Sequence, residues 1–164
     1  MPALLDADGI TAQTRRDAFT RCAQPLYQDL ADSLTQLSQQ PQVAGRPRGT
    51  IGLSSGGYFA LWLATTGRVR TENCYYGVLS GAGTDQNLRR FAAVLERHSS
   101  PVLVLHGDKD NALPAALALQ LAQPLQIYAG AGHRFERETG AANQAAADDA
   151  WQRSLAGWQQ HLSP

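Results

Sequence analysis

The hydrophobic residues of the chain form short continuous runs separated by segments with helical spacing, and this alternation predicts the fold. The clearest run, 101–106, has the unbroken apolar character of a strand covered on both faces of a parallel sheet. The runs 74–80 and 125–128 are rich in β-forming residues and lie between turn residues, so they predict two further strands. Residues 50–51 predict a fourth strand, and residues 4–5 a very short one.

Between these runs, apolar residues recur every three or four positions, which is typical of helices packed on a sheet. Pro25 suits the first turn of a helix with leucines along one face, and Pro41 follows its end. The stretch 11–24 has no clear period and predicts a loop or a short polar helix. Further helices are predicted over 58–66, where Gly67 stops the helix, and over 84–95, 114–121 and 141–162.

The last predicted helix carries two tryptophans at helical spacing. Trp151 and Trp158 share a face with Ala147, Leu155 and Leu162. Because such a face is normally buried, we expect both tryptophans in the core rather than on a ligand platform.

Strands that alternate with helices imply right-handed βαβ units and a parallel sheet. We therefore expect an α/β fold, a three-layer sandwich around a mostly parallel sheet. The chain has 164 residues, of which 43% are hydrophobic, enough for one substantial core. We expect residues 1–164 to form a single domain.

Composition narrows the classes of partner. Lysine plus arginine equals aspartate plus glutamate at 14 each, so the net charge is zero, and we expect no nucleic-acid or membrane partner. The short basic stretches 15–16 and 46–48 are expected to be solvated surface. Without a membrane-length run or the basic lead of a signal peptide, the chain is expected to be cytoplasmic. Cys22 and Cys74 are expected to be ordinary thiols, and no metal or organic cofactor is expected.

The pattern Gly52-x-Ser54-x-Gly56 stands between a predicted strand and a predicted helix, where a hydrolase holds its nucleophilic serine. A serine hydroxyl needs an exposed position and a nearby base to become a nucleophile. We expect Gly52 and Gly56 to let neighbouring backbone pass close to a strained turn. Taken alone, the pattern is equally compatible with a loop rich in glycine and serine.

Two later loops supply the partners that such a serine needs. Asp110 follows the strand 101–106, and His133 follows the strand 125–128. The carboxyl ends of parallel strands meet at one edge of a sheet, so Ser54, Asp110 and His133 are expected to converge there as nucleophile, acid and base. The order Ser, Asp, His is that of α/β-hydrolases. Asp108 competes with Asp110 as the acid, although Asp110 is preferred.

The chain resembles the α/β-hydrolase family and, within it, the dienelactone-hydrolase-like branch. The resemblance lies in Gly52-Leu53-Ser54-Ser55-Gly56-Gly57, Tyr75-Tyr76-Gly77, His106-Gly107-Asp108-Lys109-Asp110 and Gly130-Ala131-Gly132-His133-Arg134-Phe135. In that branch the segment matching residues 106–110 supplies the acid, and the segment matching residues 130–135 supplies the base. Dienelactone hydrolases use cysteine where this chain has Ser54, so the resemblance implies general ester hydrolysis more than lactone opening.

The resemblance also implies strands that this sequence lacks. Family members have several strands before the serine turn, whereas only about fifty residues precede Ser54 here, so we expect a shortened α/β-hydrolase fold. The backbone N–H of Ser55 can serve as one oxyanion donor, and the loop that supplies the second is absent. The missing strands would leave a sheet edge and an apolar face uncovered, and we therefore expect a homo-oligomer, or an amino-terminal segment that folds over the gap.

Together these features predict a serine hydrolase that acts on small carboxylic esters. Tyr58, Leu113 and Phe135 are predicted to line the substrate site, because they are adjacent to the three catalytic candidates in the sequence. Two alternatives stay open: a non-catalytic binding or assembly protein that kept the fold, and a thioesterase or acyltransferase that uses the same three residues.

Overall fold

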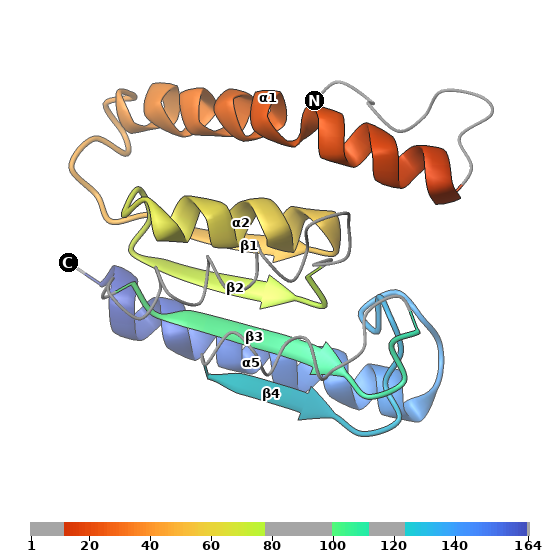
Figure 1. The fold of residues 1–164 in the computed structure, drawn as a ribbon. Coiled ribbons are helices and arrows are strands. Elements are labelled where there is room, and N and C mark those ends of the chain that lie inside the picture. The colour runs from red at the N-terminus through yellow and green to blue at the C-terminus, as the bar shows by residue number, and fades with distance from the viewer. Residues whose placement is uncertain (1–11, 78–99, 112–123, 164) are drawn as a thin grey trace.

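The computed structural model describes residues 12–77, 100–111 and 124–163 of the chain (Figure 1). The strands and helices predicted over 4–5, 84–95 and 114–121 lie outside these residues. In chain order, the described elements are α1 (Ala12–Ser38), β1 (Gly49–Leu53), α2 (Ser55–Thr65), β2 (Thr71–Tyr75), β3 (Val102–Gly107), β4 (Leu125–Tyr128) and α5 (Ala141–Leu162).

The four described strands form one parallel sheet in the order β1-β2-β3-β4. Helix α2 packs on β1 and β2, α1 lies over α2, and α5 contacts β2 and β3 (Figure 1). The two buried clusters of the core lie between these layers. This arrangement confirms the predicted α/β fold with a mostly parallel sheet in a shortened form.

Helix α1 is longer than predicted, because it runs through Pro25 instead of beginning there. A proline inside a helix costs about 3 kcal/mol, since it lacks an N–H and crowds the preceding turn. Tyr27 and Ala31, in the turns that follow, are buried, and Tyr27 stacks on Trp62 of α2 with ring centroids 4.2 Å apart. This packing stabilises the continuous helix against the cost of the proline.

Strand β2 begins three residues earlier than predicted, at Thr71, and ends at Tyr75. Its first residues are polar, so the pattern of apolar runs did not indicate them as part of a strand. All of them are nevertheless buried. Hydrogen bonds within the fold offset part of the cost: the Thr71 hydroxyl donates to the Pro101 carbonyl at 3.2 Å, and the Thr50 hydroxyl donates to one oxygen of the Glu72 carboxyl group, whose other oxygen has no partner among the described residues. Buried polar groups are tolerated in a strand when such partners exist.

The tryptophan-bearing face of α5 is not the buried face, which corrects the prediction for Trp151. The residues of α5 that are buried are Ala146, Ala150 and Ser154, whereas Trp151 is 47% exposed. Small residues face the sheet because α5 lies close to β2 and β3, where the Tyr75 hydroxyl and the Ser154 hydroxyl are 2.8 Å apart. Trp151 instead packs edge-on against the ring of Trp158.

Strand β1 forms an edge of the described sheet, and two of its apolar side chains are accessible to solvent. Ile51 is 38% exposed and Leu53 is 41% exposed. Ile51 and Leu53 are two residues apart on one strand, so their side chains point to the same face of the sheet. This is the face opposite to the one that α2 covers. The two side chains are therefore partly accessible on the side of β1 that α2 does not cover.

None of the described helices combines the length and the hydrophobicity needed to cross a lipid bilayer. Cys22 and Cys74 are free thiols, and burial raises the pKa of the Cys74 thiol, so this group stays protonated in the core.

Glu72 is fully buried in the centre of the sheet, and desolvation raises the pKa of its carboxyl group to about 8, while the hydrogen bond from Thr50 acts in the opposite direction. Between pH 4.5 and 8, the folded chain therefore binds a proton at Glu72 that the unfolded chain has released. Stability rises with pH only where the unfolded state binds more protons, so here it falls as the pH rises through this window.

We predict that Glu72→Gln raises the free energy of unfolding at pH 7 by up to about 3 kcal/mol, because the amide needs no proton to become neutral. Urea unfolding at pH 5, 6, 7 and 8 measures this: the gain should be small at pH 5 and grow toward pH 8. The exposed Glu138→Gln is the matched control and should keep the pH slope of the wild type. An equal or lower stability of Glu72→Gln at pH 8 would contradict the prediction.

Candidate active site

The carboxyl ends of the four parallel strands lie at one edge of the sheet, and each predicted site residue follows one of them. Ser54 comes directly after β1, Asp110 three residues after β3, and His133 five residues after β4. The strand register fixes their relative positions, since Leu53 pairs with Tyr75, and Tyr75 with Leu105. The structure therefore brings together the three side chains that the sequence predicted would converge.

Ser54 has a strained backbone conformation, with φ 54° and ψ −121°. A residue with a Cβ rarely adopts a positive φ, and such outliers persist only where the surrounding structure enforces them. Two hydrogen bonds hold the turn: the Ser54 N–H donates to the Tyr75 carbonyl at 3.0 Å, and the Gly57 N–H donates to the Ser54 carbonyl at 2.9 Å. The turn directs the chain from β1 into α2 and leaves Ser54 partly exposed.

Close backbone contacts on either side of this turn explain two of its glycines. A Cβ at Gly52 would lie 2.5 Å from the Gly56 carbonyl oxygen, so only glycine fits there, as predicted. The prediction for Gly56 was wrong, because a Cβ there would meet nothing within 4 Å. The tight position is Gly57, where a Cβ would lie 2.7 Å from the Cα of Gly77 in the chain that leaves β2.

A row of hydrogen bonds connects the three predicted residues. The Ser54 Oγ is 3.0 Å from the His133 Nε2, and the His133 Nδ1 is 2.8 Å from the Asp110 Oδ2. A carboxylate accepts a hydrogen bond from Nδ1–H, which leaves Nε2 as the acceptor for the serine hydroxyl. The side chain of Asp110 is fully buried and that of His133 is 20% exposed. The row therefore runs from the interior toward solvent.

Backbone contacts between two loops hold Asp110 and His133 in register. The Lys109 N–H donates to the Ala131 carbonyl at 2.9 Å, and a Cβ at Gly107 would clash with that same oxygen. Asp108 accepts a hydrogen bond from the Gly130 N–H at 2.7 Å. Asp108 thus ties the loops together, and Asp110 is the acid that contacts His133.

Two aromatic side chains that the sequence did not assign to the site border it. The buried His106 at the end of β3 has its Nε2 3.6 Å from the Asp110 Oδ2, as part of the support of that loop. Tyr76, which follows β2 with φ 35°, packs its ring edge-on to the His133 imidazole at 4.8 Å. Burial, and then a hydrogen bond with Glu136, raises the pKa of the Tyr76 phenol, so the group facing the imidazole stays neutral.

Two of the three residues predicted to line a substrate site lie in the described part of the chain, and both belong to core clusters. Tyr58 lies in the core cluster between α1 and α2, where it contacts the rings of Phe59 and Trp62. Phe135 is 1% exposed and belongs to the cluster under α5. Leu113 lies outside the described residues. Tyr58 and Phe135 thus have packing roles in the described core, and their contact with a substrate stays a prediction.

Ser55 is the first residue of α2, so its N–H lies among the amides at the helix start that have no intrahelical acceptor. It directly follows Ser54, and the positive end of the helix dipole favours negative charge at this position. Within the described ranges, no group of three or more His, Cys, Asp or Glu side chains is placed to hold a metal ion.

Comparison with known proteins places this site in a family. The sequence profile of the dienelactone hydrolase family matches residues 3–162. The chain belongs to this family. It is 28% identical over 148 residues to a protein of Bradyrhizobium sp described as "Probable 2-oxo-3-(5-oxofuran-2-ylidene)propanoate lactonase", in an alignment that covers 84% of this chain and 60% of that relative.

Solved structures of esterases share the fold. A zinc-bound, cold-adapted esterase from an Arctic intertidal metagenomic library superposes with a TM-score of 0.71 at 18% identity, over 94% of this chain and 66% of that one. The esterase domain of a Rhodothermus marinus protein gives a TM-score of 0.64 at 17% identity, in a superposition that covers 84% of this chain and 69% of that one. The chain spans 60% of the length of the Bradyrhizobium relative, and 66% and 69% of the lengths of these two esterase structures.

We predict that Gly52→Ala destabilises the fold strongly, because its Cβ would meet backbone atoms that cannot move without separating α2 from β1. The expected loss exceeds about 3 kcal/mol, comparable with overpacking of a core. Gly56→Ala is the matched control and should be neutral or stabilising by up to about 1 kcal/mol, since alanine favours helices. Thermal unfolding of both variants measures this, and equal melting temperatures would disprove the prediction.

Proposed function

We propose that the chain is a serine hydrolase that cleaves small carboxylic esters through an acyl-enzyme intermediate. The observation that carries the proposal is the row of hydrogen bonds from Ser54 through His133 to Asp110, built on a strained turn at the carboxyl edge of the sheet. Membership of the dienelactone hydrolase family and the fold shared with esterases support the same reaction class.

In this mechanism each residue has one role. The Ser54 Oγ attacks the acyl carbon while its proton passes to the His133 Nε2, and Asp110 holds the imidazole in the required tautomer. The tetrahedral intermediate collapses, the C–O bond to the alcohol breaks, and the proton on Nε2 passes to the departing alcohol. Water then attacks the acyl-enzyme in the same manner, which releases the acid and restores the Ser54 hydroxyl.

The Ser55 N–H is the donor that we assign to the oxyanion. It lies at the start of α2, adjacent to the attacking oxygen, and a backbone donor needs no reorganisation when the negative charge develops. Loss of one such donor costs roughly 10²- to 10³-fold in turnover in other hydrolases.

Lactones are a second substrate class with a specific observation in their favour. The Bradyrhizobium relative is described as a lactonase, and a lactone is a cyclic ester whose acyl carbon offers the same electrophile. With a lactone the alcohol stays attached to the acyl group, so the product is a single hydroxy acid.

We predict that the purified chain hydrolyses p-nitrophenyl acetate and that Ser54→Ala reduces this rate to the buffer background. Ser55→Ala is the matched control, because it removes a neighbouring hydroxyl but keeps the backbone N–H, and it should retain most of the rate. A burst of p-nitrophenol equal to the enzyme concentration would detect the acyl-enzyme in the wild type.

A second pair of variants tests the role of the acid in the same assay. Asp110→Asn should reduce the rate by up to about 10⁴-fold, whereas Asp108→Asn, which contacts Gly130 instead of His133, should stay within a few fold. Equal background rates in the wild type and in Ser54→Ala, for both the ester and a small lactone, would reject the hydrolase and favour a non-catalytic binding protein.

We also propose that a second copy of the chain covers the exposed apolar side chains of Ile51 and Leu53. Strand β1 is an edge of the described sheet, and this edge can pair antiparallel with the same edge of another copy about a twofold axis, which joins both sheets and brings these side chains of the two copies together.

We predict that the wild-type chain is a dimer in sedimentation velocity and that Ile51→Lys makes it a monomer, since the charge would be buried at the junction. Leu37→Lys, at a 50% exposed leucine on α1, is the matched control and should stay dimeric. A monomeric wild type at high concentration would exclude this assembly.

A further inference from the structure

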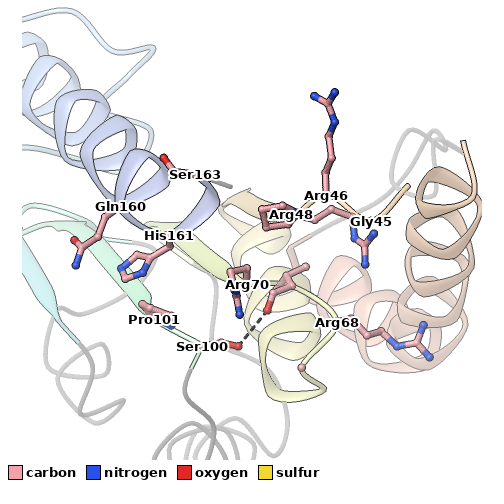
Figure 2. A pocket seen from close by; sticks show the side chains of 13 residues that line it. Gly45, Arg46, Arg48, Arg68, Arg70, Ser100, Pro101, Gln160, His161 and Ser163 are labelled. Carbon is pink, nitrogen blue, oxygen red and sulfur yellow. Dashed lines mark hydrogen bonds between the residues drawn. The ribbon is translucent and has the colours of Figure 1, made fainter. Parts of the chain in front are cut away.

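A cavity of about 720 Å³ lies at the amino ends of the strands, at the opposite edge of the sheet from Ser54. The loops before β1, β2 and β3 line it, together with the last turn of α5 (Figure 2). Its polar lining includes Arg46, Arg48, Arg68, Arg70, Ser100 and His161. Cavities between about 300 and 1,000 Å³ are typical of small-molecule sites.

The strand register explains why four arginines meet here. Gly49 of β1 pairs with Thr71 of β2, so the Arg-x-Arg segments that precede these two strands lie side by side. The Arg70 N–H donates to the Arg48 carbonyl at 2.7 Å, which continues the pairing into the loops. Residues 46–48 were expected to be solvated surface, and the second arginine pair lies about twenty residues further along the chain.

The positive charges of this cavity have no acidic counterpart in the described part of the chain. No ion pair joins any of the four arginines to a described carboxylate, and no aspartate or glutamate lines the cavity. Arg68 reaches toward α1, where its Nη1 donates to the Thr35 hydroxyl at 3.3 Å. Like charges held close together are unfavourable unless an anion offsets them.

Arg48 provides a second observation that points to a ligand. Its Nε is buried and has no hydrogen-bond partner among the described residues. A buried guanidinium donor without an acceptor costs more free energy than an ordinary unpaired group, because it carries charge. Arg48 as a whole is only half-buried, and an anion bound to the accessible part of its guanidinium group would offset this cost.

The frame of the cavity is held by the fold itself. The Ser100 hydroxyl donates to the Val69 carbonyl at 3.1 Å, which joins the loops before β2 and β3 (Figure 2). His161 adds a ring from the end of α5 that faces these loops. The loops are thus fixed before a ligand arrives, and preorganised donors bind more tightly than mobile ones.

We propose that this cavity binds a small molecule that carries two or more phosphate charges. Guanidinium groups pair with phosphate through two parallel hydrogen bonds, a geometry that lysine lacks, and every basic residue contributed by the paired loops is arginine. Arg48 and Arg70 are the principal contacts, since their backbones are joined and their neighbours Arg46 and Arg68 extend outward on either side (Figure 2). This site is separate from the proposed hydrolase site.

Isothermal titration with sodium pyrophosphate, at constant ionic strength, tests the site directly. We expect saturable one-to-one binding by the wild type and at least tenfold weaker binding by Arg48→Gln and by Arg70→Gln. Arg21→Gln, at an exposed arginine of α1, is the matched control and should bind within twofold of the wild type. Arg70 is exposed and only its backbone is hydrogen-bonded, so its variant folds even if Arg48→Gln does not.

Citrate separates phosphate recognition from general attraction to anions. It carries similar charge on carboxylates, and we expect it to bind at least tenfold more weakly than pyrophosphate. Citrate binding as tight as that of pyrophosphate, the absence of saturable heat in the wild type, or an equal loss of affinity in Arg21→Gln would each overturn the proposal. Hydrolysis of p-nitrophenyl acetate serves as the folding control and should be unchanged in Arg70→Gln.

Discussion

The close approach of α2 to the ends of β1 and β2 is the constraint from which the rest of the site follows. Two backbone contacts define it, one between Gly52 and the first turn of α2, and one between Gly57 and Gly77. Because the helix begins so near the sheet, the chain must reverse within a single residue, and Ser54 takes a positive φ. That conformation brings its hydroxyl to the His133 imidazole, so backbone packing positions the Ser54 side chain.

The sequence was sufficient to predict the central part of the fold and the three converging residues. Parallel strands buried on both faces leave unbroken apolar runs, and the loops that follow such runs must lie at one edge of the sheet. Ser54, Asp110 and His133 could therefore be placed together before any coordinates were known. The choice between Asp108 and Asp110 depended on spacing, and the structure supplies its physical basis: Asp108 is already committed to the Gly130 amide.

The predictions that were wrong share a different physical origin. Each concerned a residue whose position is set by contacts distant in sequence. The polar start of β2 is buried where Thr50 and Pro101 supply hydrogen-bond partners to Glu72 and Thr71, and Pro25 is accepted inside α1 because Tyr27 packs on α2. Likewise, Gly57 rather than Gly56 is the tight position, since only the folded chain brings Gly77 against it. Periodicity carries no information about such partners.

The two edges of the sheet have opposite chemistry, and parallel pairing produces both. At the carboxyl edge, three loops of different sequence bring together a hydroxyl, an imidazole and a carboxylate, which balance one another through hydrogen bonds. At the amino edge, the same register brings two Arg-x-Arg segments side by side, and nothing in the described part of the chain balances them. A parallel sheet gives every residue that precedes a strand a neighbour at the equivalent position of the next strand. When both are arginine, the repulsion persists in the folded state, and an anionic ligand is the simplest means of relieving it.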